Sequence, residues 1–245
     1  MNATVAAPPS IIIERVRKVF TLNHAFSFKD TLVAWVRRRQ LTSSFEALKG
    51  VDVVIREGES VALLGLNGSG KSTLLKLISG VMQPDEGQIL TRGRVAGLIE
   101  VGAGFHPELT GRENVYLNAA ILGMKQHEIE ARYDEIVAFS EIEEFIDQEV
   151  KHYSSGMFMR LAFSVAIHVD LDVLLVDEIL SVGDAPFREK CRLKFEELTA
   201  NNKTLVVVSH DAEMVRELCT RGVVLRRGEV IFDGEIDAAL NLLKG

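Results

Sequence analysis

One stretch of eight consecutive residues has the composition and spacing of a loop that holds phosphate groups. The pattern GxxxxGK[ST] is met by Gly65-Leu66-Asn67-Gly68-Ser69-Gly70-Lys71-Ser72. Glycines let backbone N–H groups turn toward phosphate oxygens, and a following helix adds a favourable dipole. We expect the Lys71 ammonium to reach the β- and γ-phosphates of a nucleotide and the Ser72 hydroxyl to bind Mg²⁺. The expected nucleotide contacts are Asn67, Gly68, Ser69, Gly70, Lys71, Ser72 and Thr73.

Two acidic residues follow a short apolar run. Residues 173–176 are Val-Leu-Leu-Val, and Asp177 and Glu178 come directly after them. Such runs are typical of parallel strands buried on both faces, and ligands of these sheets bind at the carboxyl ends of the strands. We expect Asp177 to hold Mg²⁺, directly or through water, and Glu178 to orient or deprotonate an attacking water. Together with the phosphate loop, these acids predict ATP hydrolysis.

These residues need a sheet and helices to hold them. Strand-like runs of apolar residues occur at 11–13, 51–55, 61–64, 173–176 and 205–208, and a hairpin is expected over 223–232. The region from 105 to 168 has a helical pattern, in which Thr110 and Glu113 form a capping box at the start of a helix. We therefore predict an α/β fold with an inserted helical subdomain.

Composition narrows the functional classes. The net charge is −7, which gives no electrostatic support for nucleic-acid binding. No apolar run approaches the roughly 20 residues needed to cross a bilayer, so any membrane contact is expected through a partner. Cys191 and Cys219 lack CxxC spacing and are expected to be reduced thiols. The sequence predicts a cytoplasmic chain.

The sequence resembles the ABC ATPase family over nearly its whole length. A segment ahead of the acidic pair is similar to the family's signature loop, usually written LSGGQ: Tyr153-Ser154-Ser155-Gly156-Met157. The resemblance implies that Ser154 and Gly156 contact the γ-phosphate of ATP bound to the other protomer, and therefore that the protein is a homodimer. The segment departs from the common motif at Tyr153, Ser155 and Met157.

Other positions resemble further motifs of the family. Residues 181–184 look like the D-loop, and His210 looks like the switch histidine, which would hydrogen-bond the γ-phosphate. Glu100 stands where the family usually has a Q-loop glutamine, and a carboxylate there could still bind Mg²⁺-associated water. Phe20 is expected to stack on adenine, with Phe45 as the rival, and either ring could instead belong to the core.

The resemblance implies one ABC ATPase domain over residues 1–245. A RecA-like core and an antiparallel β subdomain are expected from 11–104 and 169–245, and a helical subdomain from 105–168. An inserted amphipathic helix is expected within 23–44. Its apolar face would carry Phe28, Leu32, Trp35 and Val36, and Arg37, Arg38 and Arg39 would lie at its end. Such a basic amphipathic helix favours docking to a membrane subunit or to anionic headgroups, and packing on its own domain is the alternative.

The insert and three local segments are similar to the ATPase subunits of bacterial polysaccharide exporters, which move O-antigen, capsule, teichoic acid or related glycans. The segments are residues 102–114, 153–157 and 179–184. The resemblance implies a homodimeric motor that uses ATP and Mg²⁺ at the cytoplasmic face of the cytoplasmic membrane. The motor would bind two copies of an integral membrane permease subunit. Its action on a lipid-linked polysaccharide would be indirect. No carbohydrate-binding domain is expected after Gly245. The alternatives are a motor for another exported substrate, such as a drug or lipid, and a non-transport ABC ATPase.

Overall fold

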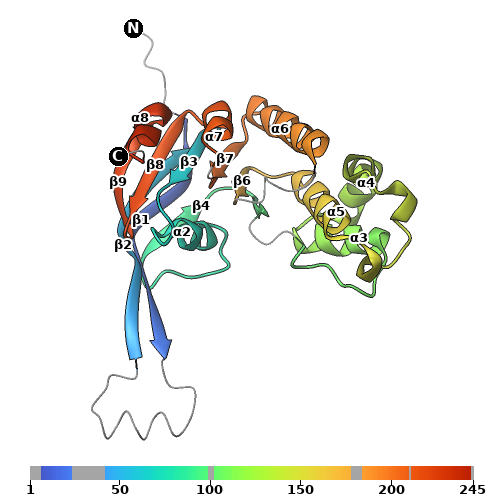
Figure 1. Cartoon of the computed structure of the whole chain (residues 1–245), viewed down its shortest axis with the longest axis horizontal. Helices are drawn as coiled ribbons and strands as arrows, with labels where there is room; N and C mark the ends of the chain where they lie inside the picture. Colours follow the sequence, from blue (N-terminus) through green and yellow to red (C-terminus); the bar gives the residue numbers. More distant parts are fainter. Residues whose placement is uncertain (1–6, 24–41, 99–101, 178–183, 210, 244–245) are drawn as a thin grey trace, which may run out of the picture.

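The computed structural model describes residues 7–23, 42–98, 102–177, 184–209 and 211–243. In chain order the elements are β1 (Pro9–Asn23), β2 (Thr42–Arg56), β3 (Ser60–Leu64), α2 (Lys71–Ile78), β4 (Glu86–Thr91), β5 (Val95–Gly97), α3 (Gly111–Ile121), α4 (Gln126–Ser140), η2 (Glu143–Phe145), η3 (Val150–His152), α5 (Ser155–Ile167), β6 (Val173–Val176), α6 (Ala185–Ala200), β7 (Thr204–Val207), α7 (Ala212–Leu218), β8 (Arg221–Arg226), β9 (Glu229–Glu235) and α8 (Ile236–Asn241). Figure 1 shows two sheets with their covering helices on one side and a group of α3, α4 and α5 on the other. The predicted α/β class with inserted helices is confirmed.

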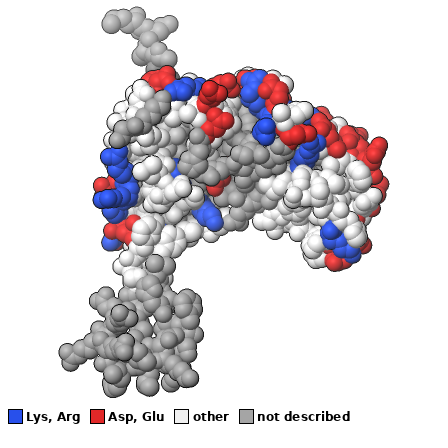
Figure 2. Space-filling model, in the orientation of Figure 1, with Lys and Arg blue, Asp and Glu red and all other residues white. Residues whose placement is uncertain are grey.

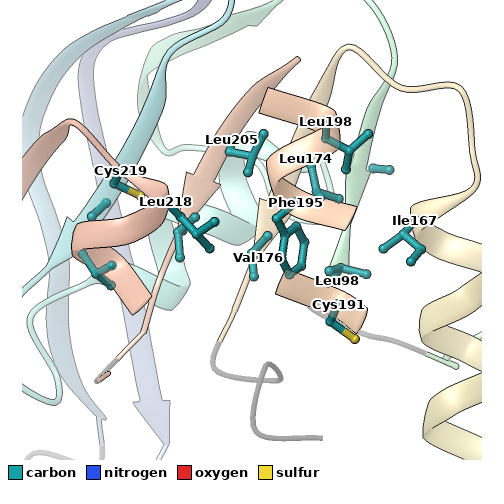
Figure 3. Close-up of a cluster of buried hydrophobic side chains, with 14 of the residues drawn as sticks. Leu98, Ile167, Leu174, Val176, Cys191, Phe195, Leu198, Leu205, Leu218 and Cys219 are labelled. Carbon is teal, nitrogen blue, oxygen red and sulfur yellow. The ribbon is translucent and has the colours of Figure 1, made fainter. Parts of the chain in front are cut away.

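A six-stranded sheet forms the centre of the larger part. Its order is β5-β6-β7-β3-β8-β9, in which β9 alone runs antiparallel to its neighbour. Every residue of β3, β6 and β7 is buried, as expected for parallel strands covered on both faces. On one face, Phe195 of α6 points toward Val176 of β6 (Figure 3). The carboxyl ends of these strands therefore share one rigid edge of the sheet.

The other face is covered by α2 and by a three-stranded sheet of order β2-β1-β4. Strands β1 and β2 pair antiparallel from Pro9↔Arg56 to Asn23↔Thr42, and their hairpin extends beyond the rest of the described chain (Figure 1). The strands are much longer than the predicted runs at 11–13 and 51–55. The predicted insert over 23–44 is too long at both ends: Asn23 belongs to β1 and residues 42–44 belong to β2, because these residues pair across the hairpin. The predicted helix over 28–39 lies outside the described residues.

The helices α3, α4 and α5 share a hydrophobic cluster of their own. Its buried members are Val115, Ala119, Met124, Ile129, Ile136, Val137, Ile142, Ile146, Leu161, Val165 and Val169. The predicted capping box is confirmed, since Thr110 accepts from the Glu113 N–H and the Glu113 carboxylate accepts from the Thr110 N–H. Helix α5 also contributes Phe163, Ala166 and Ile167 to the hydrophobic cluster that contains Val176 of β6 and Phe195 of α6. It therefore connects the two parts of the molecule mechanically.

None of the described helices combines the length and apolar character needed to cross a membrane.

Candidate nucleotide-binding site

The glycine-rich loop leaves the carboxyl end of β3 in a conformation that requires its glycines. Gly65, Gly68 and Gly70 have φ of 145°, 77° and 109°, in the region that side-chain-bearing residues rarely adopt. A Cβ on Gly70 would lie 2.7 Å from the carbonyl oxygen of Ala47 in β2. The loop therefore sits directly against β2, and glycine at position 70 permits that contact.

The residues of the loop fit phosphate groups. Glycine at the N-cap of α2 supplies no side-chain acceptor, so the helix N-terminus can offer its first N–H groups to an anion. Lys71 is only 7% exposed, and its Nζ lies 2.8 Å from the Gly65 oxygen and 3.2 Å from the Leu66 oxygen. Within the described part of the chain, the Ser69 hydroxyl is buried without a hydrogen-bond partner. A buried cation and an unsatisfied hydroxyl are the groups that a phosphate would satisfy.

The acidic strand end shares its sheet edge with this loop. Val176 of β6 is in register with Val207 of β7, which is in register with Ala62 of β3. Asp177 is the first residue after β6, and Gly65 is the first residue after β3. The structure thus places Asp177 at the same edge of the sheet as the loop that leads from β3 to Lys71.

Several predicted site residues fall beyond what the structure describes. Glu100, Glu178 and His210 are among them, and their assigned roles stay predictions. The residues flanking position 210 are described: the Ser209 hydroxyl accepts from the Asp211 N–H at 3.0 Å. Asp211 in turn caps α7 through the Glu213 and Met214 N–H groups. Local hydrogen bonds therefore join Ser209 to Asp211 and Asp211 to the start of α7.

The two aromatic candidates for the adenine contact lie opposite each other. Phe20 of β1 is the register partner of Phe45 of β2, and directly opposed residues of antiparallel strands project from the same face. Phe45 is 50% exposed, and the Lys18 ammonium lies 5.9 Å from the Phe20 ring centroid. Phe20 and Phe45 are therefore neighbours, and Phe45 lies two residues along β2 from Ala47, which contacts the phosphate loop.

The segment resembling the signature loop begins helix α5. Ser154 is the N-cap residue, and its Oγ accepts from the Met157 N–H at 3.2 Å. The Met157 side chain packs against the cluster of α3, α4 and α5, which gives a structural reason for its difference from the family's glutamine. Helices α2 and α5 stand in separate parts of the molecule (Figure 1). Ser154 and Lys71 are therefore carried by different parts of the chain.

Figure 2 shows charges of both signs over α6, mainly acidic residues at the edge where α4 lies, and a largely uncharged surface over α3 and α5. On α6 these charges form ion pairs such as Arg192–Glu189 at 2.7 Å and Lys194–Glu197 at 2.8 Å. Mixed signs of this kind are typical of solvated helix faces, whereas nucleic-acid-binding surfaces carry a basic stripe.

Sequence reasoning did not single out Arg160. Its guanidinium lies 2.7 Å from Asp184, the last residue of the predicted D-loop, and 2.8 Å from Glu141 at the end of α4. Asp184 also caps α6 through the Phe187 N–H. Arg160 therefore joins α4, α5 and α6. No short-range pattern points to it, because its partners are 19 and 24 residues away.

Fold and site together define a P-loop nucleotide-binding protein with an inserted group of helices. Residues 48–181 match the family model described as ABC transporter. The chain belongs to the ABC transporter family.

Its relatives include transport proteins of several bacteria. The chain is 40% identical to the O-antigen export system ATP-binding protein RfbB of Klebsiella pneumoniae, over 96% of this chain and 98% of the relative. It is 53% identical to the ABC transporter protein AbcA of Aeromonas salmonicida over 80% of this chain, and 46% identical to RfbB of Myxococcus xanthus over 85%. The matched parts make up 64% and 48% of those two relatives, so the chain spans less than two thirds of their length.

Solved structures agree with the fold. One ATP-binding subunit of an ABC transporter matches with a TM-score of 0.75 and 22% identity, over 96% of this chain and 95% of that one. A dimeric, post-hydrolysis ATP-binding cassette bound to ADP and Pi matches with a TM-score of 0.72 and 25% identity, over 92% and 98%.

Proposed function

We propose that this chain is the ATP-hydrolysing subunit of a membrane transporter that exports a lipid-linked polysaccharide. The observation that carries the ATPase role is the phosphate loop, in which Lys71 is buried and the Ser69 hydroxyl has no hydrogen-bond partner among the described residues. The cargo is proposed from the Klebsiella relative, which is named for O-antigen export and matches along 98% of its length.

The binding step uses groups that lie around the loop. We assign the backbone N–H groups from Gly68 to Thr73 and the Asn67 side chain to contacts with the phosphates. Lys71 exchanges its carbonyl contacts for phosphate oxygens, which are stronger acceptors because they are charged. Phe20 stacks on adenine, and the neighbouring Phe45 extends the apolar surface on the same face of the hairpin.

Hydrolysis uses the acidic strand end. We assign the Ser72 hydroxyl and the Asp177 carboxylate to Mg²⁺, which would neutralise charge on the phosphates when bound. We assign Glu178 to orienting or deprotonating the attacking water, and His210 to hydrogen-bonding the γ-phosphate. Glu100 completes the assignment as a contact to water around the metal.

Two copies of the chain are needed for a complete site. Ser154 lies at the N-terminus of α5, where a hydroxyl and backbone N–H groups suit an anion. Because this helix stands apart from α2 (Figure 1), we assign Ser154 and Gly156 to the nucleotide on the partner protomer. The homodimer would act at the cytoplasmic face of the membrane, bound to two copies of a permease subunit.

The proposal is tested in cells that lack their own copy of this chain. Export of the surface glycan should return with the unaltered chain and should fail with Lys71→Ala, while the lipid-linked glycan accumulates inside. Lys194→Ala is the matched control, since it removes a lysine that is paired with Glu197 on α6, a helix separate from the phosphate loop. Export that persists undiminished with Lys71→Ala would contradict the proposal.

A further inference from the structure

The segment 102–114, which resembles polysaccharide exporters, contacts the signature segment and the residues just before it at two places. The first place is the Phe158 ring, one turn into α5. It meets the Phe105 ring edge-on, with centroids 5.1 Å apart and planes at 62°. A Cβ on Gly102 would lie 2.5 Å from the same Phe158 ring, so glycine at position 102 permits the close contact.

The second place is a short antiparallel pairing ahead of the signature loop. Thr110 and Glu149 form an isolated β-bridge. The Val150 N–H donates to the Leu109 oxygen and the Lys151 N–H to the Pro107 oxygen, both at 2.9 Å. The backbone that leads to Ser154 is therefore paired with the segment before α3.

Asn114 makes that segment internally rigid. Its side chain has no exposed surface, and it accepts from the His106 N–H at 2.7 Å. It donates to the oxygens of His106, Leu109 and Thr110 at 3.0, 3.1 and 2.9 Å. Residues 106–111, which we call the brace loop, are thus held as one unit to the start of α3.

Tyr153, the first residue of the signature loop, is hydrogen-bonded to η2 and lies against Gly111 of the brace loop. Its hydroxyl donates to the Phe145 oxygen at 2.8 Å, and a Cβ on Gly111 would lie 2.1 Å from the same hydroxyl oxygen. Burial raises the pKa of Tyr153 to about 12, so the hydroxyl stays protonated and remains a donor. Tyr153 directly precedes Ser154, and a shift of its ring would therefore move the N-cap of α5.

We propose that Tyr153 is a positioning residue: its bond to the Phe145 oxygen and its contact with Gly111 hold the signature loop against η2 and the brace loop, so that all three move as one body when two protomers close on ATP. This inference rests on the proposed function. It accounts for a tyrosine where the common signature has leucine, because a leucine has no hydroxyl to bond the Phe145 oxygen. Glycine at position 111 is needed for the same contact, because it leaves room for the Tyr153 hydroxyl.

The test uses the full chain in complex with its permease, and compares Tyr153→Phe, Gly111→Ala and the double variant. Tyr153→Phe keeps the ring and removes one hydrogen bond, so kcat for ATP should fall about fivefold while KM changes less than about twofold. Gly111→Ala should lower kcat further, because its Cβ displaces the hydroxyl. The kcat of the double variant should recover to about that of Tyr153→Phe. Without the hydroxyl, the nearest atom to the Cβ at position 111 is the Ile146 oxygen, at 3.0 Å instead of 2.1 Å.

Tyr133→Phe is the matched control. In the described part of the chain the Tyr133 hydroxyl is buried without a hydrogen-bond partner, so its removal should leave kcat unchanged. Nucleotide binding by the isolated chain, followed with a fluorescent ATP analogue, should be the same in all variants because the phosphate loop is untouched. Thermal unfolding confirms that each variant is folded.

The outcomes separate the two proposals. If the unaltered complex does not hydrolyse ATP, the proposed function is wrong. If the unaltered complex hydrolyses ATP, two results would contradict the positioning role: an unchanged kcat for Tyr153→Phe, or a kcat of the double variant no higher than that of Gly111→Ala. Tyr153 would then only pack among the helices.

Discussion

The ammonium group of Lys71 donates a hydrogen bond to the backbone oxygen of Gly65, 2.8 Å away. A second contact, to the Leu66 oxygen at 3.2 Å, closes the first residues of the loop onto the first residue of α2. The same cation that is expected to bind phosphate thus also braces the loop. Its buried charge is held by carbonyl dipoles, which a phosphate would replace with a full negative charge.

Replacing this lysine should weaken nucleotide binding. Lys71→Ala removes charge-assisted hydrogen bonds to the β- and γ-phosphates, and we expect the Kd for ATP to rise at least about tenfold. Titration of a fluorescent ATP analogue measures the change, with Lys194→Ala as the control. An unchanged Kd would show that Lys71 is not a phosphate ligand.

The proposed metal ligands should separate binding from turnover. Ser72→Ala and Asp177→Asn remove oxygen ligands for Mg²⁺ but leave the loop glycines and Lys71 in place. We expect binding of ATP without Mg²⁺ to stay within about threefold, while the Mg²⁺ concentration for half-maximal hydrolysis rises at least about tenfold. Steady-state hydrolysis against Mg²⁺ concentration provides the test. Identical curves for the variants and the unaltered chain would remove both residues from the metal site.

The opposed aromatic pair should contribute to binding of the base. Stacking on one ring is worth about 1–3 kcal/mol by alanine substitution, so Phe20→Ala should raise the Kd for ATP at least about fivefold. Phe45→Ala should have a smaller effect, because we assign it to the edge of the platform. The same titration ranks the two rings. If only Phe45→Ala weakens binding, the stacking role belongs to Phe45, and Phe20 is core.

Both thiols should be unreactive until the protein unfolds. Burial raises the pKa of Cys191 and of Cys219 to about 12, so at pH 8 almost none of either is the reactive thiolate. Folding favours the neutral thiols, and the free energy of unfolding should therefore decrease as the pH rises past the ordinary value of about 9. A colourimetric thiol reagent at pH 8 should label no cysteine in the native protein and two in denaturant. Rapid labelling of the native chain would contradict this burial.

Local patterns were enough to find the phosphate loop, the acidic end of β6 and the capping box at Thr110. Each depends on residues close together in the sequence, where glycine conformation, strand burial or helix capping dictates the structure. The hairpin of β1 and β2 could not be predicted in this way. The Phe20↔Phe45 pair depends on a register between distant strands, and polar residues interrupt the apolar pattern of those strands.

The contacts of Tyr153 and Arg160 are non-local in the same sense. Tyr153 departs from a recognisable motif in the sequence. Its hydroxyl occupies the space that a side chain at position 111 would fill, and this contact forms only in the folded chain. Arg160 acquires its role from the meeting of α4, α5 and α6. Sequence patterns therefore suggested which residue types form the site, and the roles of Glu100, Glu178 and His210 stay predictions; the structure was needed to see how the described residues contact one another.

Mixing two inactive variants tests most directly whether ATP is hydrolysed in a site shared by two copies of the chain. Lys71→Ala disables the phosphate loop, and Ser154→Arg disables the signature loop, so each homodimer has two defective sites. A heterodimer of the two variants has one site with both defects and one intact site. We predict that hydrolysis reappears on mixing, at a level that depends on the heterodimer fraction. Mixtures that stay as inactive as the separate variants, although heterodimers form, would contradict the shared site.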